Sequence, residues 1–265
     1  MANLRATINY LGRTTGRPRF HSQDPRRDNL NLDPRELTIF DGRDAGGRPS
    51  IAVEGIELLP HATGIDDFAT AEAMDAYRLE IQSFIQALTG ALDVRVMGTL
   101  VRYGERSPMS VSGTQNRPAR FAHVDFSEAE VFRRMSLKTP RRSGRVAMYH
   151  VWRALSEPPQ DIPLAVCDAS SLSDRDLVES DAVRDIGAEP WNCSEGYTVR
   201  YNAAHRWFYF SDMKRDEALV FKGYDSDPAQ PIRAPHCAFD RPDAGLHAMP
   251  RQSVDTRAFC IFGDA

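Results

Sequence analysis

The sequence lacks the arrangements of cysteine and apolar residues that mark zinc-knot, disulfide-rich and membrane proteins. Its four cysteines have no C-x-x-C spacing, which excludes a zinc knot and a disulfide framework and is typical of reduced thiols in the cytoplasm. No apolar run approaches the roughly 20 residues of a membrane span, and the N-terminus has no apolar core of a secretion signal. We therefore expect a cytoplasmic protein with no membrane partner.

Motifs of several common enzyme classes are absent as well. The chain has no Gly-rich phosphate loop, no G-x-S-x-G elbow and no H-E-x-x-H stretch, which excludes nucleotide binding, α/β-hydrolase chemistry and zincin chemistry. The formal net charge of −4 gives no surplus of basic residues for a nucleic-acid partner. What remains is chemistry carried out by a metal.

The 265 residues are enough for one large β domain with a filled core, because β barrels and sandwiches often reach this length. Residues 1–55 mix Arg, Asp, Gly and Pro with few apolar side chains. We expect this segment to be an irregular N-terminal arm. It would wrap the main domain at residues 56–265 or meet a second subunit in a homodimer.

Hydrophobic periodicity predicts the main elements of that domain. Apolar residues at helical spacing over residues 66–88, followed by Thr89-Gly90, predict a helix. A capping pattern at Ser127 predicts a short second helix, and residues 170–183 are polar and helix-like. Alternation predicts strands over 94–103 and 217–224, a strand over 145–155 paired with 164–167, and a hairpin of 197–201 with 206–210. The polar stretch 104–120 is expected to be a recognition loop over a pocket.

The stretch at residues 121–126 carries the pair of side chains around which the chain is organised. In an extended strand successive side chains alternate between faces, so His123 and Asp125 point the same way. An imidazole beside a carboxylate supplies two of the three ligands in the 2-His-1-carboxylate arrangement that holds a divalent iron. A bare H-x-D pair is a weak signal, so the metal hypothesis requires a third ligand from elsewhere in the chain.

Two histidines compete for the third position. His236 lies on or beside a predicted strand, in the stretch 234–239. His205 lies in the turn of the predicted hairpin, where a hydrogen-bonded wall histidine is the alternative interpretation.

The C-terminal strand predicted over residues 250–262 has an unusual polar face, formed by Arg251, Ser253, Asp255 and Arg257. An arginine with a nearby hydroxyl suits a carboxylate ligand, because the guanidinium offers a bidentate fork and the hydroxyl one more donor. Arg251 with Ser253 fits this pattern, and Arg257 is the alternative. We expect one of the two arginines to be structural, in an ion pair with Asp255 or a neighbour of Asp125.

Other side chains are candidates for the pocket wall. His150 and Trp152 share one face of their strand, and Tyr149 lies on the opposite face. Alternation does not decide which face points inward. Arg102, near the end of the 94–103 strand, is a further candidate.

The order His123-x-Asp125, His236, Arg251-x-Ser253 resembles the signature of iron(II)/2-oxoglutarate oxygenases. Four longer stretches resemble one branch of them, the CmcJ/NvfI family, which includes proteins named for cephalosporin 7-alpha-methoxylase and gibberellin-desaturase-like enzymes of secondary metabolism. These stretches are HVWRALSEPPQDIPLAVCDASSLSDRDLVESD, YTVRYNAAHRWFYFSDMKRDEALVFKGYDSD, APHCAFDRP and PRQSVDTRAF. The resemblance covers roughly residues 60 to 262 and is more specific than the ligands alone.

This resemblance implies a mainly β fold with flanking helices around a double-stranded β-helix, a jelly-roll or cupin-like core. It implies that His123, Asp125 and His236 hold iron(II) and that 2-oxoglutarate meets Arg251 and Ser253. In this fold the anchor strand follows the third ligand closely, which favours His236 over His205.

The expected function is hydroxylation, desaturation or cyclisation of a small molecule by O2, with release of succinate and CO2. Two alternatives stay open. A metal-dependent hydrolase or isomerase could use the same three ligands, although it would have no use for a carboxylate anchor. A non-catalytic barrel that binds small molecules is the other.

Overall fold

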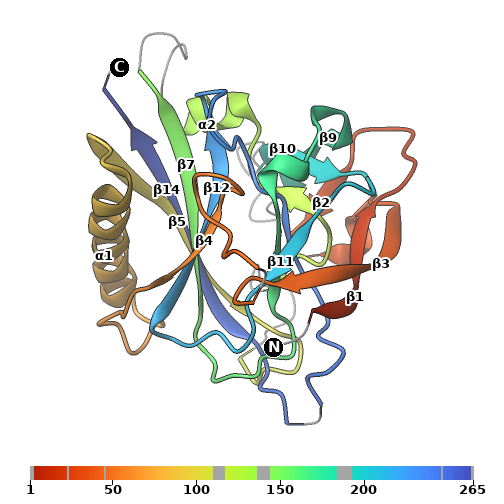
Figure 1. The fold of residues 1–265 in the computed structure, drawn as a ribbon, viewed down its shortest axis with the longest axis horizontal. Helices are drawn as coiled ribbons and strands as arrows, with labels where there is room; N and C mark the ends of the chain where they lie inside the picture. Colours follow the sequence, from red (N-terminus) through yellow and green to blue (C-terminus); the bar gives the residue numbers. More distant parts are fainter. Residues whose placement is uncertain are drawn as a thin grey trace.

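The structure is a computed structural model that describes residues 3–22, 24–44, 46–109, 117–135, 144–183, 193–245 and 247–263. Two β-sheets face each other across a common interior (Figure 1). The larger sheet has nine strands in the order β1-β3-β11-β8-β13-β6-β10-β9-β2, and the smaller has five in the order β4-β12-β7-β14-β5. The predicted class, mainly β with flanking helices, is confirmed.

The strands of the larger sheet are β1 (Leu4–Leu11), β2 (Arg19–His21), β3 (Leu32–Asp41), β6 (His123–Val124), β8 (Leu164–Cys167), β9 (Leu177–Val183), β10 (Cys193–Val199), β11 (Trp207–Tyr209) and β13 (His236–Ala238). Those of the smaller sheet are β4 (Ile56–Pro60), β5 (Asp93–Tyr103), β7 (Val146–Ala154), β12 (Glu217–Asp225) and β14 (Gln252–Ile261). The helices are α1 (Ala71–Thr89) and α2 (Glu128–Arg134), with 3-10 turns at Pro25–Arg27, Ala169–Ser171 and Asp174–Asp176.

Helix α1 covers the outer face of the five-stranded sheet (Figure 1). The Thr70 hydroxyl caps its N-terminus, and Gly90 ends it in the left-handed conformation with φ 68°. Tyr77 and Ile81 are fully buried in the core that the helix shares with the sheet. The predicted helix is confirmed but begins at Ala71, because the cap at Thr70 fixes the first turn.

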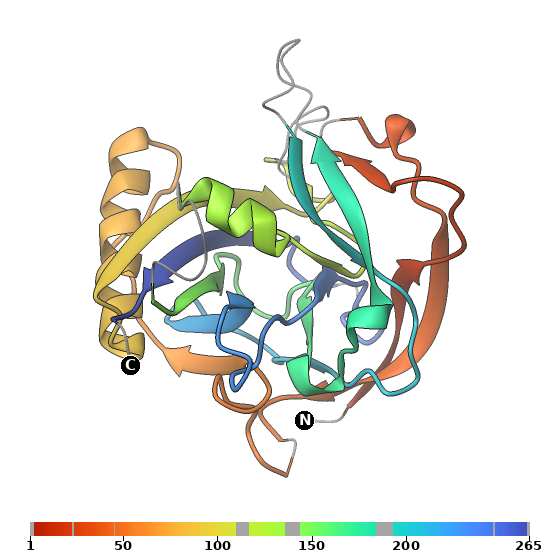
Figure 2. The same cartoon turned by 90° about the horizontal axis from the view of Figure 1, so that it is seen from above.

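From β5 onward the chain passes repeatedly between the sheets, which curve around the interior (Figure 2). The predicted pairing of residues 145–155 with 164–167 is therefore wrong, because β7 pairs with β12 and β14 while β8 pairs with β11 and β13. The predicted hairpin is also wrong, since β10 pairs with β6 and β9, and β11 pairs with β3 and β8. Both predictions assumed that neighbours in sequence pair, whereas the connection through Pro158-Pro159 crosses from one sheet to the other.

The N-terminal segment is not the irregular arm that its composition indicates. β1 and β3 pair antiparallel from Leu4↔Ile39 to Leu11↔Leu32. β2 pairs in parallel with β9 at the opposite end of the same sheet. β1 buries Leu4, Ala6, Ile8 and Tyr10 at every second position, the alternation that marks a strand even in a polar segment. The segment thus supplies both outer strands of the nine-stranded sheet.

Residues 170–183 also differ from the prediction. The expected polar helix is replaced by two 3-10 turns and the strand β9, so the capping residues in this stretch start only single turns. Helix α2 follows its predicted cap, because the Ser127 hydroxyl accepts a hydrogen bond from the backbone of Glu130. The four cysteines are free thiols. Within the described ranges, none of the helices has the length and apolar character to cross a membrane.

Candidate active site

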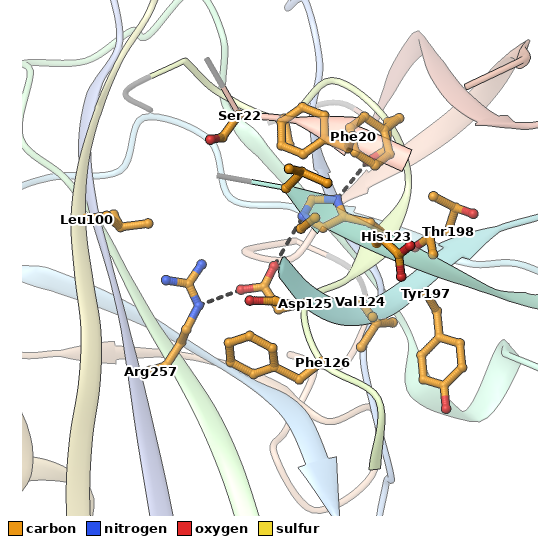
Figure 3. A pocket seen from close by; sticks show the side chains of 18 of the residues that line it. Phe20, Ser22, Leu100, His123, Val124, Asp125, Phe126, Tyr197, Thr198 and Arg257 are labelled. Carbon is orange, nitrogen blue, oxygen red and sulfur yellow. Dashed lines mark hydrogen bonds and ion pairs between the residues drawn. The ribbon is translucent and has the colours of Figure 1, made fainter. Parts of the chain in front are cut away.

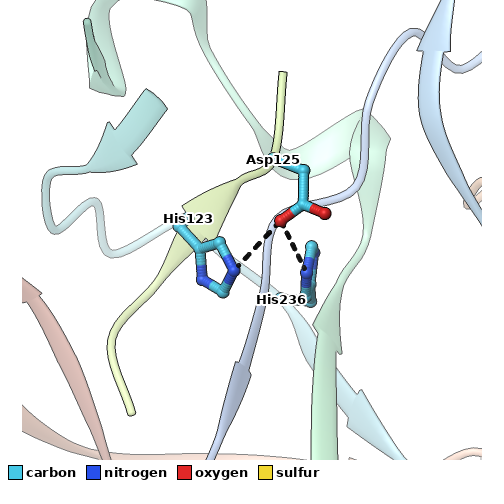
Figure 4. A group of neighbouring side chains, drawn as sticks. All are labelled: His123, Asp125 and His236. Carbon is cyan, nitrogen blue, oxygen red and sulfur yellow. Dashed lines mark ion pairs between the residues drawn. The ribbon is translucent and has the colours of Figure 1, made fainter. Parts of the chain in front are cut away.

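Sheet pairing brings the two histidines of the metal hypothesis together. The short strand β6 lies between β13 and β10, and in its antiparallel pairing with β13 His123 is directly opposite His236. The two rings are 4.3 Å apart between centroids. Asp125 points to the same side as His123, as alternation predicts (Figure 4). Two residues of one strand and one of its neighbour therefore share a single site.

The potential ligand atoms of these residues surround a small space. One ligand atom from each of His123, Asp125 and His236 lies within 4.8 Å of the others. Nε2 of His123 is 3.4 Å and Nε2 of His236 is 3.7 Å from Oδ1 of Asp125 (Figure 4). Both separations exceed the usual N–H···O distance of about 2.7–3.2 Å. The three groups thus converge on one space without forming hydrogen bonds of normal length to one another.

The hydrogen bond of His123 and the lowered pKa of His236 both suit metal binding. Nδ1 of His123 is 2.8 Å from the backbone oxygen of Phe121, so donating its proton there leaves a lone pair on Nε2. Burial, with the nearby His123 and His150 rings, holds the pKa of His236 well below its usual range, so this ring is neutral at pH 7. Neutral imidazoles and a carboxylate are the donor set that a divalent iron prefers, and the residues fit the metal.

A buried arginine from the other sheet holds Asp125. Nε of Arg257 on β14 donates to Oδ2 of Asp125 at 2.5 Å (Figure 3). Nη2 of Arg257 is 3.0 Å from Oδ2 of Asp255. Burial raises the pKa of Asp125, but the charge of Arg257 outweighs it and keeps the pKa well below its usual range. Arg257, the alternative anchor, is thus engaged by two carboxylates, the ion pair expected for one of the two arginines.

His150 lies behind Asp125 and is fully buried. Its Nδ1 is 3.2 Å from Oδ1 of Asp255, and its Nε2 is 3.9 Å from Oδ2 of Asp125. The ring stacks on Phe221 with centroids 4.5 Å apart. Asp255 therefore connects His150 with Arg257, and the two residues support Asp125 from one side. The sequence placed Asp255 on the right face but gave no signal for its contact with His150.

The orientation of β7 that alternation left open is now defined. His150 and Trp152 face the interior between the sheets. Tyr149 faces the core under α1, where its hydroxyl is 3.0 Å from Nζ of Lys222. Of these three candidates, Trp152 lines a cavity, His150 contacts the surroundings of Asp125, and Tyr149 lies outside the site.

A small cavity of about 20 Å³ separates the histidines from Arg251. His123 and His236 form one wall, and Arg251, Trp152 and Arg102 are among the residues of the others. The predicted metal ligands come from the larger sheet and the predicted anchor from the smaller one. This space is therefore where a ligand could touch both.

Arg251 is a buried cation whose partners are neutral. Its Nε donates to Oγ of Ser253 at 3.0 Å and its Nη1 to the backbone oxygen of Ile162 at 3.2 Å. The guanidinium lies 5.1 Å from the centre of the Trp152 ring. Burial and the nearby Arg102 lower the pKa of Arg251 to about 9, so it is still charged at pH 7. Among the described residues no carboxylate forms an ion pair with it, and since buried charges are normally paired, it suits an anion from outside the chain.

A larger cavity of about 100 Å³ opens beside His123 and Asp125 (Figure 3). Its wall includes residues of β2, β9 and β10, which no sequence pattern predicted to lie near His123 and Asp125. Arg102 lines both cavities, and its Nη1 donates to the backbone oxygen of Arg117 at 2.9 Å. Gly196 on β10 lies so close to β6 that a Cβ would stand 2.5 Å from the backbone oxygen of Asp125.

The predicted recognition loop at residues 104–120 falls partly outside the described residues, which omit 110–116. Within the described part, Ala119 lines both cavities. The loop therefore borders the site at the end that precedes β6.

His205, the rival third ligand, lies away from this cluster. Its Nδ1 is 3.2 Å from the hydroxyl of Tyr10 and its Nε2 is 3.1 Å from Oδ2 of Asp176. Because both ring nitrogens bond to the protein, we expect His205→Gln to retain full metal content when the purified protein is analysed by plasma mass spectrometry. Loss of metal in this variant would return His205 to the ligand set.

The same variant should change how stability depends on pH. Burial lowers the pKa of His205 below its unfolded value near 6.5, so protonation favours the unfolded chain. The stability that neutral His205 contributes is present above about pH 6.5 and is lost as pH falls through the folded-state pKa. Between about pH 7.5 and 5.5, urea unfolding of wild type should lose more free energy than that of His205→Gln. The exposed His247→Gln is the matched control, and an equal loss in all three proteins would contradict the assignment.

Two histidines and a carboxylate, set between a small cavity with a buried arginine and a larger cavity, match the arrangement found in non-heme metal enzymes of the 2-His-1-carboxylate class.

Comparisons with known proteins agree with this class. The profile of a family described as oxidoreductase/YMDC permease-like domain matches residues 8–261. The Fe(II)/2-oxoglutarate-dependent dioxygenase nvfI of Aspergillus novofumigatus is 29% identical over 255 residues, which are 94% of this chain and 84% of that protein. The hydroxylase/desaturase CTB9 of Cercospora beticola is 31% identical over 241 residues, 81% of this chain and 72% of that protein.

A solved structure of the iron and alpha-ketoglutarate-dependent endoperoxidase NvfI shares the fold, with a TM-score of 0.82 and 24% identity over 100% of this chain and 99% of that one. The chain belongs to the CmcJ/NvfI family of iron(II)/2-oxoglutarate-dependent dioxygenases. This membership confirms the enzyme class and the cofactors, iron(II), 2-oxoglutarate and O2, that the sequence resemblance implies.

Proposed function

We propose that this protein oxidises a small molecule of the secondary-metabolite type, by hydroxylation, desaturation or ring formation, and that His123, Asp125 and His236 hold its iron. The observation that carries the proposal is the convergence of these three side chains beside a small cavity. His123 and His236 line that cavity together with Arg251, which is bonded to Ser253. The relatives named as hydroxylase/desaturase and dioxygenase support the same range of reactions.

When bound, iron and 2-oxoglutarate supply oxygen activation coupled to decarboxylation, which yields succinate and CO2. The role of the protein is to bind and orient iron and 2-oxoglutarate. Arg257 keeps Asp125 ionised and fixes which of its oxygens faces the two histidines. Arg251 and Ser253 would hold the far carboxylate of 2-oxoglutarate, so that its keto-acid end would lie on the side of His123 and His236.

The small cavity between the histidines and Arg251, called the inner cavity from here on, is also suited to keeping water away from 2-oxoglutarate. Trp152, Leu164 and Phe221 contribute its apolar wall, and the first two come from different sheets. A carboxylate bound there would meet the guanidinium of Arg251 in a water-poor space, where the attraction between opposite charges is stronger than in bulk water.

We further propose that the two sheets form a double-stranded β-helix, a jelly-roll or cupin-like core. The regular alternation of β5, β6, β7 and β8, and again of β11, β12, β13 and β14, between the sheets supports this topology. A cytoplasmic location, the absence of nucleic-acid and membrane partners and a homodimer stay predictions from the sequence.

Anaerobic addition of 2-oxoglutarate to the iron(II)-loaded protein is the test that separates the candidate functions. A weak visible charge-transfer band should appear, because the keto acid chelates the iron, and succinate in place of 2-oxoglutarate should give none. Iron binding without the band would favour a metal-dependent hydrolase or isomerase. A protein that retains no iron would favour the non-catalytic barrel.

A further inference from the structure

We propose that the larger cavity takes an uncharged, ring-sized apolar part of the substrate, and that Ser22, directly after the N-terminal strand β2, binds a hydroxyl or carbonyl oxygen of that part. The inference rests on the proposed function, because it assigns a substrate class to the same site. It also gives the N-terminal segment a direct role in recognition.

The size and wall of the cavity indicate the apolar character of its occupant. Its volume of about 100 Å³ approaches that of engineered apolar cavities, about 150 Å³, that bind benzene. Large apolar side chains form much of the wall; they are Phe20, Leu100, Phe121, Val124 and Phe126. Figure 3 shows Phe20 along one side of the pocket and Phe126 along the other. A single ring between them would leave the rest of the substrate outside.

Charged groups in the wall are already engaged by the protein. Asp181 accepts from Nε of Arg17 at 2.6 Å and lies 3.3 Å from Nε of Arg19. Asp125 and Arg257 pair with each other. An ionised substrate group would have to break one of these pairs to find a counter-charge, at a cost that an uncharged group avoids.

Arg102 is the remaining charged residue of the wall. It donates to the backbone oxygen of Arg117 and also lines the inner cavity, beside Arg251. The positive charge of Arg102 therefore acts on the inner cavity, where we propose that 2-oxoglutarate binds. This arrangement leaves hydrogen bonding, not ion pairing, as the polar contact for the substrate.

Ser22 offers that contact. Its Oγ is buried and has no hydrogen-bond partner among the described residues, although buried hydroxyls are normally bonded. The backbone N–H of Ser22 donates to the oxygen of Val183 at 2.9 Å, so the residue is fixed at the wall. Two other hydroxyls of the wall are engaged, since Ser194 accepts from Arg134 and Thr198 donates to Val178.

The strand β2, which ends directly before Ser22, is itself held in place. Nη2 of Arg117 donates to the backbone oxygen of His21 at 3.2 Å, and the rings of Phe20 and Phe121 are 5.1 Å apart. These contacts bind β2 to the segment that leads into β6. The backbone at Ser22 is thus held at the cavity wall before the substrate arrives, which lowers the entropic cost of binding.

Three fluorinated probes of one shape test the proposal. The protein is loaded with 2-oxoglutarate and either Mn(II) or Zn(II), and binding of 4-fluorophenol, fluorobenzene and 4-fluorobenzoate is followed by ¹⁹F NMR titration at about pH 7.5, where only the benzoate is charged. We expect affinity to fall in that order. Ser22→Ala should weaken the binding of 4-fluorophenol by about 3- to 10-fold, because one hydrogen bond is lost. The affinity for fluorobenzene should stay within about twofold of the wild-type value.

Matched variants define the controls. Ser211→Ala removes another buried hydroxyl that has no partner in the described chain and does not line the cavity, so it should change neither affinity. Ser22→Thr keeps a hydroxyl and should keep the preference for 4-fluorophenol. Tightest binding of 4-fluorobenzoate would overturn the uncharged class, and an unchanged preference in Ser22→Ala would overturn the role of Ser22.

The choice of metal separates this inference from the proposed function. Probes in the cavity beside His123 and Asp125 should relax faster with Mn(II) than with Zn(II). Binding that depends on Ser22 without this enhancement would support the cavity assignment and contradict the metal site. Binding of Mn(II) and 2-oxoglutarate with no probe preference would leave the proposed function standing and overturn the inference.

Discussion

His123→Ala and Asp125→Ala are each expected to abolish turnover and to weaken metal binding by more than about 100-fold, because even residues that only support metal ligands change affinity by about 10- to 100-fold. The cluster has one carboxylate, and its negative charge is what offsets the charge of the ion. Removing Asp125 also leaves Arg257 with Asp255 alone, so a cation remains beside the empty position.

Metal titration followed by EPR of Mn(II), together with succinate release from 2-oxoglutarate, measures both effects. His247→Ala is the control, because this histidine is exposed and is not part of the cluster. Turnover retained in either ligand variant would remove His123 and Asp125 from the mechanism.

Arg251→Ala is expected to raise the KM for 2-oxoglutarate by at least about 30-fold while metal affinity and the KM for the substrate stay within a few fold. Truncating one partner of a buried charge pair costs about 2 kcal/mol or more, and Arg251 is buried in the wall of the inner cavity. Arg251→Lys should recover part of the loss, since it keeps the charge but not the planar fork.

Arg257→Ala is the informative comparison. Because Arg257 pairs with Asp125 and Asp255, its replacement by alanine should weaken metal binding. The 2-oxoglutarate requirement of the metal-saturated variant should stay nearly unchanged. Steady-state kinetics with metal in excess separates the two variants. If Arg257→Ala raises the 2-oxoglutarate requirement and Arg251→Ala does not, the anchor assignment moves to Arg257.

The sequence predicted those parts of the site that depend on local geometry. His123 with Asp125, and Arg251 with Ser253, are pairs two residues apart, and the period of an extended strand places each pair on one face. The position of His236 opposite His123 depends on the pairing of β13 with β6, which local pattern does not contain. The family resemblance supplied this step.

The wall of the larger cavity was not predicted, for a physical reason. β2 has three residues, too few to show alternation, and its pairing places Phe20 beside Ala182. Contacts between segments so far apart in the chain are set by the packing of the whole sheet. The contact of His150 with Asp255 was missed for the same reason, because β7 is buried on both faces and shows no inward pattern.

The close approach at Gly196 restricts how substrate preference can be redesigned. A methyl group there would collide with backbone atoms of Val124 and Asp125, which cannot move without displacing the carboxylate that we assign to iron. Position 196 is therefore closed to engineering, although it lines the cavity. Variation in the molecules that this scaffold accepts can instead come from other residues of the wall, such as Ser194, Thr198 and Phe20 of the N-terminal strand.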